Sequence, residues 1–321
     1  MLLPLAVAGA CGGAGEPPPG APHCPGVAAS QAFVRLPAGD PELRRVSEDN
    51  LRAWVELLAA PELRGRHAAS AESQAVAALL AEQLAVLGLS SPYPDGGYCQ
   101  SFPILGTRDQ NVIAHLSGAT AGAKRPVVLI GAHYDGQGVH PAGSVFPGAD
   151  DNASGVAALL EVARLAQRRR AQWNVDLVFA AFGAEETGQM GSEAYVAEPS
   201  VPLSRILLMI NLDMVGRPLP DEGADGIGFL ALGSDPERVR AMLEQAGATA
   251  GIAIRDLADL GDASSVRSDA SVFRLLVPTL FLTTGSHGDQ HQLTDTPDRI
   301  DYEQVARAAT LVLTLLSEVS S

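Results

Sequence analysis

The sequence lacks several features that would assign it to a special class of protein. Lysine and arginine number 22 against 37 aspartates and glutamates, and the net charge of −15 excludes the clustered basic surface that nucleic acids require. No apolar run reaches the about 20 residues of a membrane-spanning helix, so membrane contact would come only through an anchor. The stretch Gly136-Gln137-Gly138 lacks the lysine and the further glycine of a phosphate-binding loop, which excludes that type of site.

Apolar residues, in contrast, are plentiful. They make up 46% of the 321 residues, which is enough for the core of one large α/β domain or two small ones. We find no internal repeat and no linker to a second domain. We therefore expect a single domain over residues 31–321, and the sequence leaves its oligomeric state open.

The N-terminal residues have the character of an export segment. Residues 1–10 are apolar and precede Cys11 and a tract rich in glycine and proline. This arrangement resembles a bacterial lipoprotein signal, with residues 1–10 as the signal peptide, Cys11 as the lipidation site and residues 11–30 as a flexible tether. The alternative is a plain export signal. Both imply an extracytoplasmic protein, either lipid-anchored to a bacterial membrane or periplasmic or secreted.

The two remaining cysteines form an even pair. If Cys11 carries a lipid, Cys24 and Cys99 are left in an oxidising compartment. A disulfide that ties the N-terminal segment to the domain is therefore plausible.

Hydrophobic periodicity predicts strands that alternate with helices. Two N-terminal helices begin near Ser47 and Ser70, both typical capping residues, and an edge strand is expected over 98–102. The further strands are expected at 111–116, 127–132, 175–182, 206–213, 229–232 and 278–283, and the further helices around 154–169, 190–198, 235–246, 267–276 and 302–318. This alternation indicates an α/β fold whose sheet is covered on both faces, with function at the carboxyl ends of its strands.

Residues that can bind a metal ion follow four of the predicted strands. Because the carboxyl ends of parallel strands meet at one rim, we expect these side chains to converge. They are His133 with Asp135, Glu185 with Glu186, Asp213, and His291. In the pair His133-x-Asp135, the imidazole would be the ligand and the carboxylate would orient it. Imidazole and carboxylate without thiolate suit zinc, with cobalt or manganese as substitutes.

An acidic turn, Asp150-Asp151, lies between the first two of these strand ends. Taken alone it could simply cap the helix that follows, because carboxylates and residues such as Asn152 and Ser154 favour helix N-termini. Its position beside the predicted rim also allows a role in metal binding.

Five segments together resemble the zinc aminopeptidases of peptidase family M28, in the family's order. They are Gly131-Ala132-His133-Tyr134-Asp135, the run from Pro147 to Gly155, Phe182-Gly183-Ala184-Glu185-Glu186, Asn211-Leu212-Asp213, and the run from His291 to Asp298. The resemblance implies a three-layer αβα fold with a mostly parallel mixed sheet, as in zinc exopeptidases. It also implies peptide substrates and two zinc ions per chain.

The resemblance further implies a role for each site residue. Asp150 would bridge the two zinc ions, His133 and Asp213 would bind the first, and Glu186 and His291 would bind the second. Glu185 would be the general base that activates the attacking water, and Asp151 would be structural, like Asp135. His287 competes with His291 for the ligand position. Where the family often has Ser-Asp-His, this chain has Ser268-Asp269-Ala270, so any contact of that histidine is lost.

Other functions stay open on the same scaffold. Carboxypeptidase action or glutaminyl cyclisation would use similar chemistry, and a non-catalytic binding module would use the fold alone. The complete set of expected ligands and the Glu185 base favour hydrolysis, and we expect release of N-terminal residues from peptides.

Overall fold

We analysed a computed structural model, which describes residue 24 and residues 45–119, 125–219, 226–260 and 267–320. The predictions for residues 1–10 and Cys11 fall outside the described residues, and so does the predicted tether except for Cys24. Among the helices of the described residues, none combines the length and the apolar character needed to cross a membrane.

The strands form one mixed sheet of eight strands in the order β1-β2-β4-β3-β5-β8-β6-β7. Neighbouring strands run parallel in β4-β3, β3-β5, β5-β8 and β6-β7, and antiparallel in the other three pairs. Their bounds are β1 Cys99–Ile104, β2 Thr107–Leu116, β3 Val127–His133, β4 Asp176–Phe182, β5 Ile206–Leu212, β6 Gly226–Leu232, β7 Ala253–Asp256 and β8 Thr279–Thr283. The α/β architecture with a mostly parallel mixed sheet is confirmed. The short strand β7 was not predicted, because its four residues carry no continuous apolar run.

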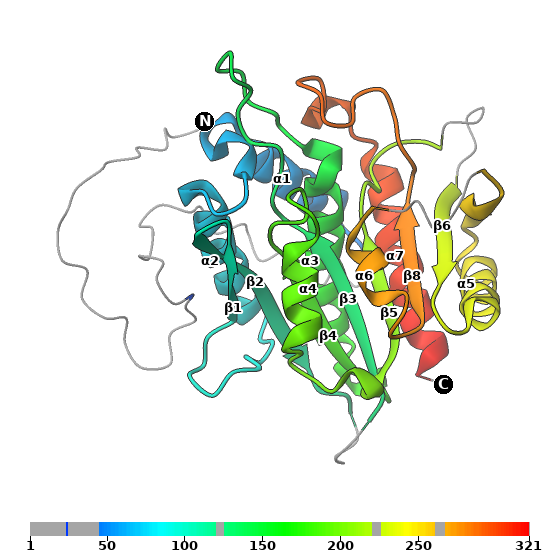
Figure 1. The fold of residues 1–321 in the computed structure, drawn as a ribbon. Helices are drawn as coiled ribbons and strands as arrows, with labels where there is room; N and C mark the ends of the chain where they lie inside the picture. The colour runs from blue at the N-terminus through cyan, green and yellow to red at the C-terminus, as the bar shows by residue number, and fades with distance from the viewer. Residues whose placement is uncertain (1–23, 25–44, 120–124, 220–225, 261–266, 321) are drawn as a thin grey trace.

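Helices cover both faces of the sheet, so the fold has three layers (Figure 1). The helices are α1 Glu48–Leu58, α2 Ala71–Val86, α3 Gly155–Arg168, α4 Met190–Ala197, α5 Pro236–Ala250, α6 Asp269–Phe273 and α7 Tyr302–Val319. Figure 1 looks onto the face covered by α4 and α6, with α1, α3 and α7 behind the sheet. Alternate residues of each strand point to opposite faces, as a pleated strand requires. Leu129 packs in the cluster under α4 and α6, whereas Ile130 packs in the large cluster on the other face.

The first two helices begin where the sequence predicts. The Ser47 hydroxyl accepts a hydrogen bond from the backbone N–H of Asn50, and the Ser70 hydroxyl accepts one from Ser73. These caps satisfy N–H groups that have no partner within the helix. The connection between the two helices, Pro61–Arg66, is a 3₁₀ segment with a kink at Arg64 and Gly65.

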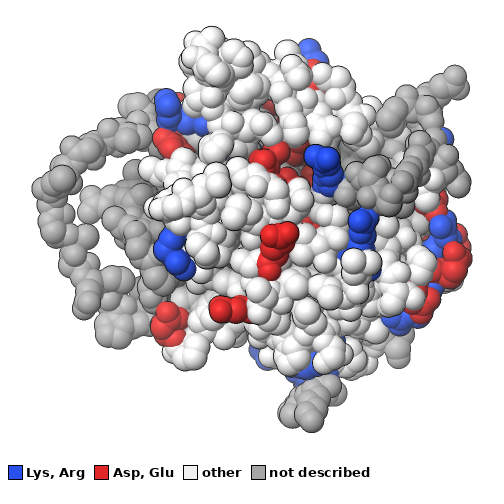
Figure 2. Space-filling model, viewed as in Figure 1, with Lys and Arg blue, Asp and Glu red and all other residues white. Residues whose placement is uncertain are grey.

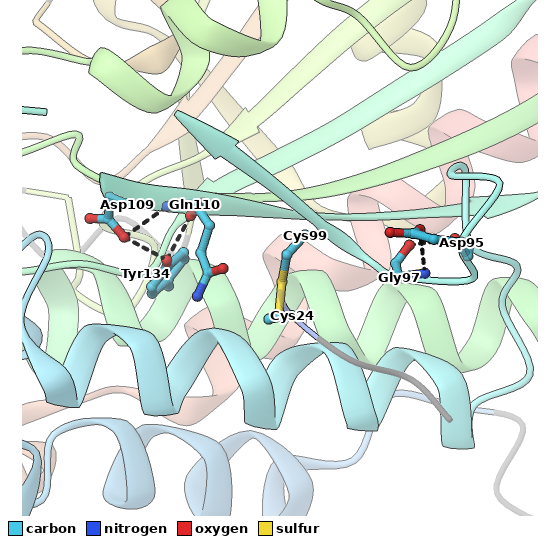
Figure 3. The surroundings of a disulfide bond; sticks show 8 residues. Cys24, Asp95, Gly97, Cys99, Asp109, Gln110 and Tyr134 are labelled. Atoms are coloured by element: carbon cyan, nitrogen blue, oxygen red, sulfur yellow. Dashed lines mark hydrogen bonds between the residues drawn. A yellow bond between two sulfur atoms is a disulfide. The ribbon is translucent and has the colours of Figure 1, made fainter. Parts of the chain in front are cut away.

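A disulfide joins Cys24 to Cys99, the pairing that the sequence made plausible. Figure 3 shows the bond between strand β1 and the helix α2, which runs along this face of the sheet. Both cysteines are buried in the large core cluster. The bond therefore attaches the N-terminal segment to the edge strand of the sheet.

Candidate metal centre

Most of the predicted site residues meet in a cavity at the carboxyl ends of the parallel strands. Strands β3, β4 and β5 are neighbours, and His133, Glu185, Glu186 and Asp213 stand at or just beyond their ends. The cavity has a volume of about 690 Å³, and these four side chains contribute to its wall. Figure 2 shows acidic side chains at the base of a recess above the strand ends.

Two groups of potential metal ligands share one carboxylate. The first group is His133, Asp151 and Asp213, and the second is Asp151, Glu186 and His291; within each group the ligand atoms lie within 4.8 Å of one another. Nε2 of His133 is 3.3 Å from Oδ1 of Asp151 and 3.4 Å from Oδ1 of Asp213. Nε2 of His291 is 3.0 Å from Oδ2 of Asp151 and 3.2 Å from Oε2 of Glu186. Asp151 thus turns one oxygen toward each group.

The sequence predicted Asp150 as the carboxylate shared by the two groups, and this prediction is wrong by one residue. Oδ1 of Asp150 accepts a hydrogen bond from the backbone N–H of Gly216 at 2.7 Å, and Oδ2 lies 2.9 Å from Nε2 of His287. Asp150 is fully buried and does not belong to either ligand group. Asp151, which we expected to be structural, stands between the groups. His287 pairs with Asp150, so His291 is the histidine that joins the second group.

The backbone of the acidic turn explains why Asp151, and not Asp150, faces the ligand groups. The Asp295 carboxylate accepts hydrogen bonds from the backbone N–H groups of Asp150 and Asp151, at 3.0 to 3.1 Å. Asn152 has non-helical backbone angles, and its Oδ1 accepts from the N–H groups of Gly155 and Met214. The helix α3 therefore begins only after a turn that is held by side chains from distant segments, and this turn aims Asp151 at the cavity.

Asp135 holds the segment that carries the paired glutamates. Its two oxygens accept from the backbone N–H groups of Glu185 and Glu186, at 3.0 and 3.1 Å. Oδ1 also lies 3.6 Å from Nδ1 of His133, on the side expected for an orienting carboxylate. Asp135 is completely buried, so it ties the end of β3 to the end of β4.

The paired glutamates face different partners. Oε1 of Glu185 accepts from the Gln189 side chain at 2.9 Å, and Oε2 of Glu186 accepts from the Gln137 side chain at 2.6 Å. Burial raises the pKa of Glu185 to about 9, although the nearby His133 lowers it. Burial likewise raises the pKa of Glu186. The carboxyl groups of these two glutamates therefore resist ionisation unless a positive charge is close.

Asp213 is positioned by a chain of hydrogen bonds from the segment that departs from the family pattern. The Ser268 hydroxyl donates to Oδ2 of Asp213 at 2.7 Å and accepts from the Asn211 side chain at 2.7 Å. Asp269 is fully buried beside them, and burial raises its pKa to about 7. The loss of the family's histidine at Ala270 leaves this support for Asp213 in place.

The residues present fit divalent metal ions. Oε1 of Glu186 is buried and has no hydrogen-bond partner among the described residues, as a free ligand atom should be. The side chains of Asp151 and Glu186 raise the pKa of His291 to about 10. This shift shows that the two carboxylates favour a positive charge beside them, which a metal ion would also supply. Metal binding commonly displaces the proton of such a histidine. Two groups of imidazole and carboxylate donors that share one carboxylate suit a pair of zinc ions.

Sequence reasoning missed three residues that support the site. Asp295 lies in the run from His291 to Asp298, but no role was predicted for it. Gln137 follows the strand β3 and gave no chemical signal. Arg66 lies in the polar link between the first two helices and gave no chemical signal, yet it is only 1% exposed.

Comparison with known proteins identifies the family. The pattern of peptidase family M28 matches residues 111–316, which is more than half of the chain. The Escherichia coli K12 protein YfbL is 29% identical over 246 residues, covering 68% of this chain and 73% of YfbL.

Two solved structures share the fold. BSAP, a zinc aminopeptidase from Bacillus subtilis, is 25% identical with a TM-score of 0.54, and the match covers 67% of this chain and 51% of BSAP. This chain therefore matches only about half the length of BSAP. A glutaminyl cyclase from Bacteroides thetaiotaomicron is 20% identical with a TM-score of 0.66, covering 85% of this chain and 98% of the cyclase, which shows a common fold. Given the match over residues 111–316, the chain belongs to peptidase family M28.

Proposed function

We propose that this protein is a zinc-dependent aminopeptidase that uses two zinc ions to hydrolyse the N-terminal peptide bond of its substrates. His133 and Asp213 would hold one ion, Glu186 and His291 the other, and Asp151 would bridge them. The observation that carries the proposal is the position of Asp151, which lies 3.3 Å from His133 and 3.0 Å from His291 with different oxygens. Membership in family M28 and the similarity to a zinc aminopeptidase support it.

Glu185 is suited to move the proton of the reaction. It is buried and lines the cavity. Its carboxylate bonds the side chain of Gln189, whereas that of Glu186 bonds Gln137. Bound zinc would polarise the scissile carbonyl and lower the pKa of water in the cavity. Glu185 would accept the proton of the attacking water and return it to the leaving amine. Gln189, whose side chain donates to Glu185 at 2.9 Å, would hold the carboxylate in place.

The charge of the cavity favours a substrate with a free amino terminus. In the zinc-loaded cavity Asp151, Glu186 and Asp213 would be balanced by the two ions. The Glu185 carboxylate, which also lines the cavity, would be left to complement a protonated α-amino group. An acetylated amino terminus carries no charge and would lose this attraction. We therefore expect cleavage from the amino end of peptides.

Glutaminyl cyclisation is the second candidate, because a glutaminyl cyclase has the same fold. The two reactions are separable by their products, since cyclisation releases ammonia and leaves a pyroglutamyl peptide without cutting the chain. Two complete ligand groups favour hydrolysis over a reaction that needs one zinc ion.

The test combines metal content with a panel of substrates. Zinc per chain is measured by elemental analysis, and the zinc-loaded protein is incubated with amino-acid anilides and with peptides that carry free or acetylated amino termini. We expect two zinc ions and cleavage of free peptides only. Cleavage that survives acetylation would exclude the aminopeptidase assignment, and a complete lack of hydrolysis would favour a binding module.

We also propose that the protein is exported and anchored through a lipid on Cys11. The buried disulfide Cys24–Cys99 supports an oxidising compartment. The test is fractionation of cells that express the wild-type protein or Cys11→Ser. Release of only the variant from the membrane fraction would support the anchor, and identical fractionation would exclude it.

A further inference from the structure

The guanidinium of Arg66 is buried and donates hydrogen bonds to the two backbone segments that carry His133 and Asp151. Nε donates to the carbonyl of Tyr134 at 3.0 Å, and Tyr134 lies between His133 and Asp135. Nη1 donates to the carbonyl of Pro147 at 2.9 Å, and Nη2 donates to that of Gly148 at 3.0 Å. A further bond from Nη1 to the carbonyl of Leu58 joins the group to the end of α1.

The acceptors of Arg66 lie at the base of the two segments that carry ligands. Tyr134 follows His133 directly, and Gly148 precedes Asp151 by three residues. His133 belongs to the first ligand group, whereas Asp151 belongs to both. One planar side chain therefore spans the two backbone segments whose separation sets the first group, and one of these segments carries the carboxylate that both groups share. Because all four acceptors are backbone carbonyls, the contact depends on the shape of the fork as well as on its charge.

The backbone around Arg66 is held in an unusual conformation. Arg64, Gly65 and Arg66 have positive φ angles of 46°, 69° and 52°, which side chains other than glycine adopt rarely. A Cβ atom at Gly65 would collide with the carbonyl of Gly138. Hydrogen bonds from Gly136 and Gly138 to the carbonyls of Arg66 and Gly65 lock this segment against the loop after β3. Strained residues of this kind persist where the surrounding structure overdetermines them, often next to functional sites.

The charge of Arg66 lies among carboxylates that it does not bond. Burial lowers its pKa to about 10, while Asp135, Asp295, Asp151 and Glu186 raise it, so the guanidinium stays protonated at neutral pH. Asp295 bonds the N–H groups of the acidic turn, and Arg66 bonds the carbonyls just before it. The turn is therefore held from both sides by buried groups of opposite charge.

We propose that Arg66 is a positioning residue of the metal centre: its fork sets the distance between His133 and Asp151 and thereby allows both zinc ions to bind. The proposal rests on the proposed function for the identity of the metal. It assigns no contact between Arg66 and the substrate. Nearby Arg64 serves as the matched control, because it has the same backbone conformation but is exposed and pairs with Glu72 at 3.4 Å.

The test uses the full-length protein with three substitutions, Arg66→Lys, Arg66→Gly and Arg64→Lys. Lysine keeps the charge but lacks the fork, whereas glycine tolerates the positive φ and leaves a space that can admit a free guanidinium ion. Zinc affinity is measured by competition with a chromophoric chelator, together with kcat, KM and the melting temperature of the zinc-free protein.

We expect Arg66→Lys and Arg66→Gly to lose at least about tenfold in zinc affinity and to lose kcat rather than raise KM, because ligand supports commonly act on this scale. Millimolar guanidinium should restore zinc affinity to Arg66→Gly and leave Arg66→Lys unchanged. Arg64→Lys should bind zinc like the wild type.

Three outcomes would overturn the proposal. The first is wild-type zinc affinity in both Arg66 variants. The second is a fall in the melting temperature of the zinc-free protein without any change in zinc binding, which indicates a role in folding alone. The third is equal zinc loss in Arg64→Lys. If the wild-type protein binds no zinc at all, the proposed function fails first, so the two failures are distinguishable.

Discussion

The adjacent carboxylates of Asp150 and Asp151 point into different surroundings. Asp150 accepts a hydrogen bond from the backbone of Gly216 at 2.7 Å, whereas Asp151 faces His133 at 3.3 Å. Asp295 separates them by bonding the backbone N–H groups of both residues. One residue of the pair therefore supports the neighbouring loop, and the other is available to metal ions.

Exchange of each acid for its amide should separate these two roles. We expect Asp151→Asn to lower zinc binding from two ions per chain to less than one and to reduce hydrolysis at least about 100-fold, because both ligand groups lose their common member. Asp150→Asn should keep two zinc ions and cost about 1–2 kcal/mol of stability, because the Gly216 N–H loses a charged acceptor. Elemental analysis and urea unfolding are the measurements. Zinc loss from Asp150→Asn with full retention in Asp151→Asn would restore the assignment made from sequence.

Substitution of Glu185 should separate catalysis from metal binding. Glu185→Gln keeps the size of the side chain and the contact with Gln189 but removes the proton acceptor. We expect wild-type zinc content and a fall in kcat of about 10²–10⁴-fold, which is the usual contribution of a general base. Thr187→Ser, a conservative change in the same loop, is the control. Near-normal turnover by Glu185→Gln would require another base.

Removal of the disulfide should weaken the fold without changing the site. Cys24 and Cys99 are separated by 75 residues, and a bond that closes a long loop restricts the unfolded chain. We expect Cys24→Ser with Cys99→Ser to lower the free energy of unfolding by about 2–4 kcal/mol. Urea denaturation measures this loss, and Cys11→Ser should show none of it. A double variant as stable as the wild type would mean that the bond adds nothing to folding.

The contribution of His115 to the stability of the protein should be lost in mild acid. Burial lowers the pKa of this imidazole to about 4 in the folded state, with Asp176 opposing the shift and Arg205 adding to it. In the unfolded chain the pKa is about 6.5, so between pH 6.5 and pH 4 the unfolded state binds the additional proton. The contribution of neutral His115 is therefore complete above pH 6.5 and is lost as the pH falls toward 4.

The effect at pH 5 is measurable as a difference between variants. A wild-type protein moved from pH 7 to pH 5 should lose about 1–2 kcal/mol through His115 alone, at the lower end because the side chain is partly exposed. His115→Gln can keep the contact with Ser200 and should lose that much less over the same interval. His67→Gln, at an exposed loop position, should follow the wild type. Parallel pH profiles for wild type and His115→Gln would refute the assignment.

Local patterns in the sequence were sufficient to predict most elements of the fold. Ser47 and Ser70 act as caps because capping depends on a side chain and the N–H groups two or three residues later. Strand β3 could be predicted because a strand buried on both faces needs an uninterrupted apolar run. The direction of β6, which runs antiparallel to β8, could not be predicted, because an apolar sequence fits a strand of either direction.

The sequence by itself determined which residues could reach the rim, because His133, Glu185, Glu186 and Asp213 stand at strand ends that a parallel sheet must bring together. Only the tertiary structure decided which of two adjacent acids faces the cavity. That choice depends on Asp295, which bonds the acidic turn, and on Arg66, which bonds the carbonyls just before it. These residues stand 144 and 85 positions away from Asp151 (295 − 151 and 151 − 66). Contacts between residues so far apart in the sequence follow from the packing of the whole domain, and they cannot be predicted from the spacing of neighbouring residues.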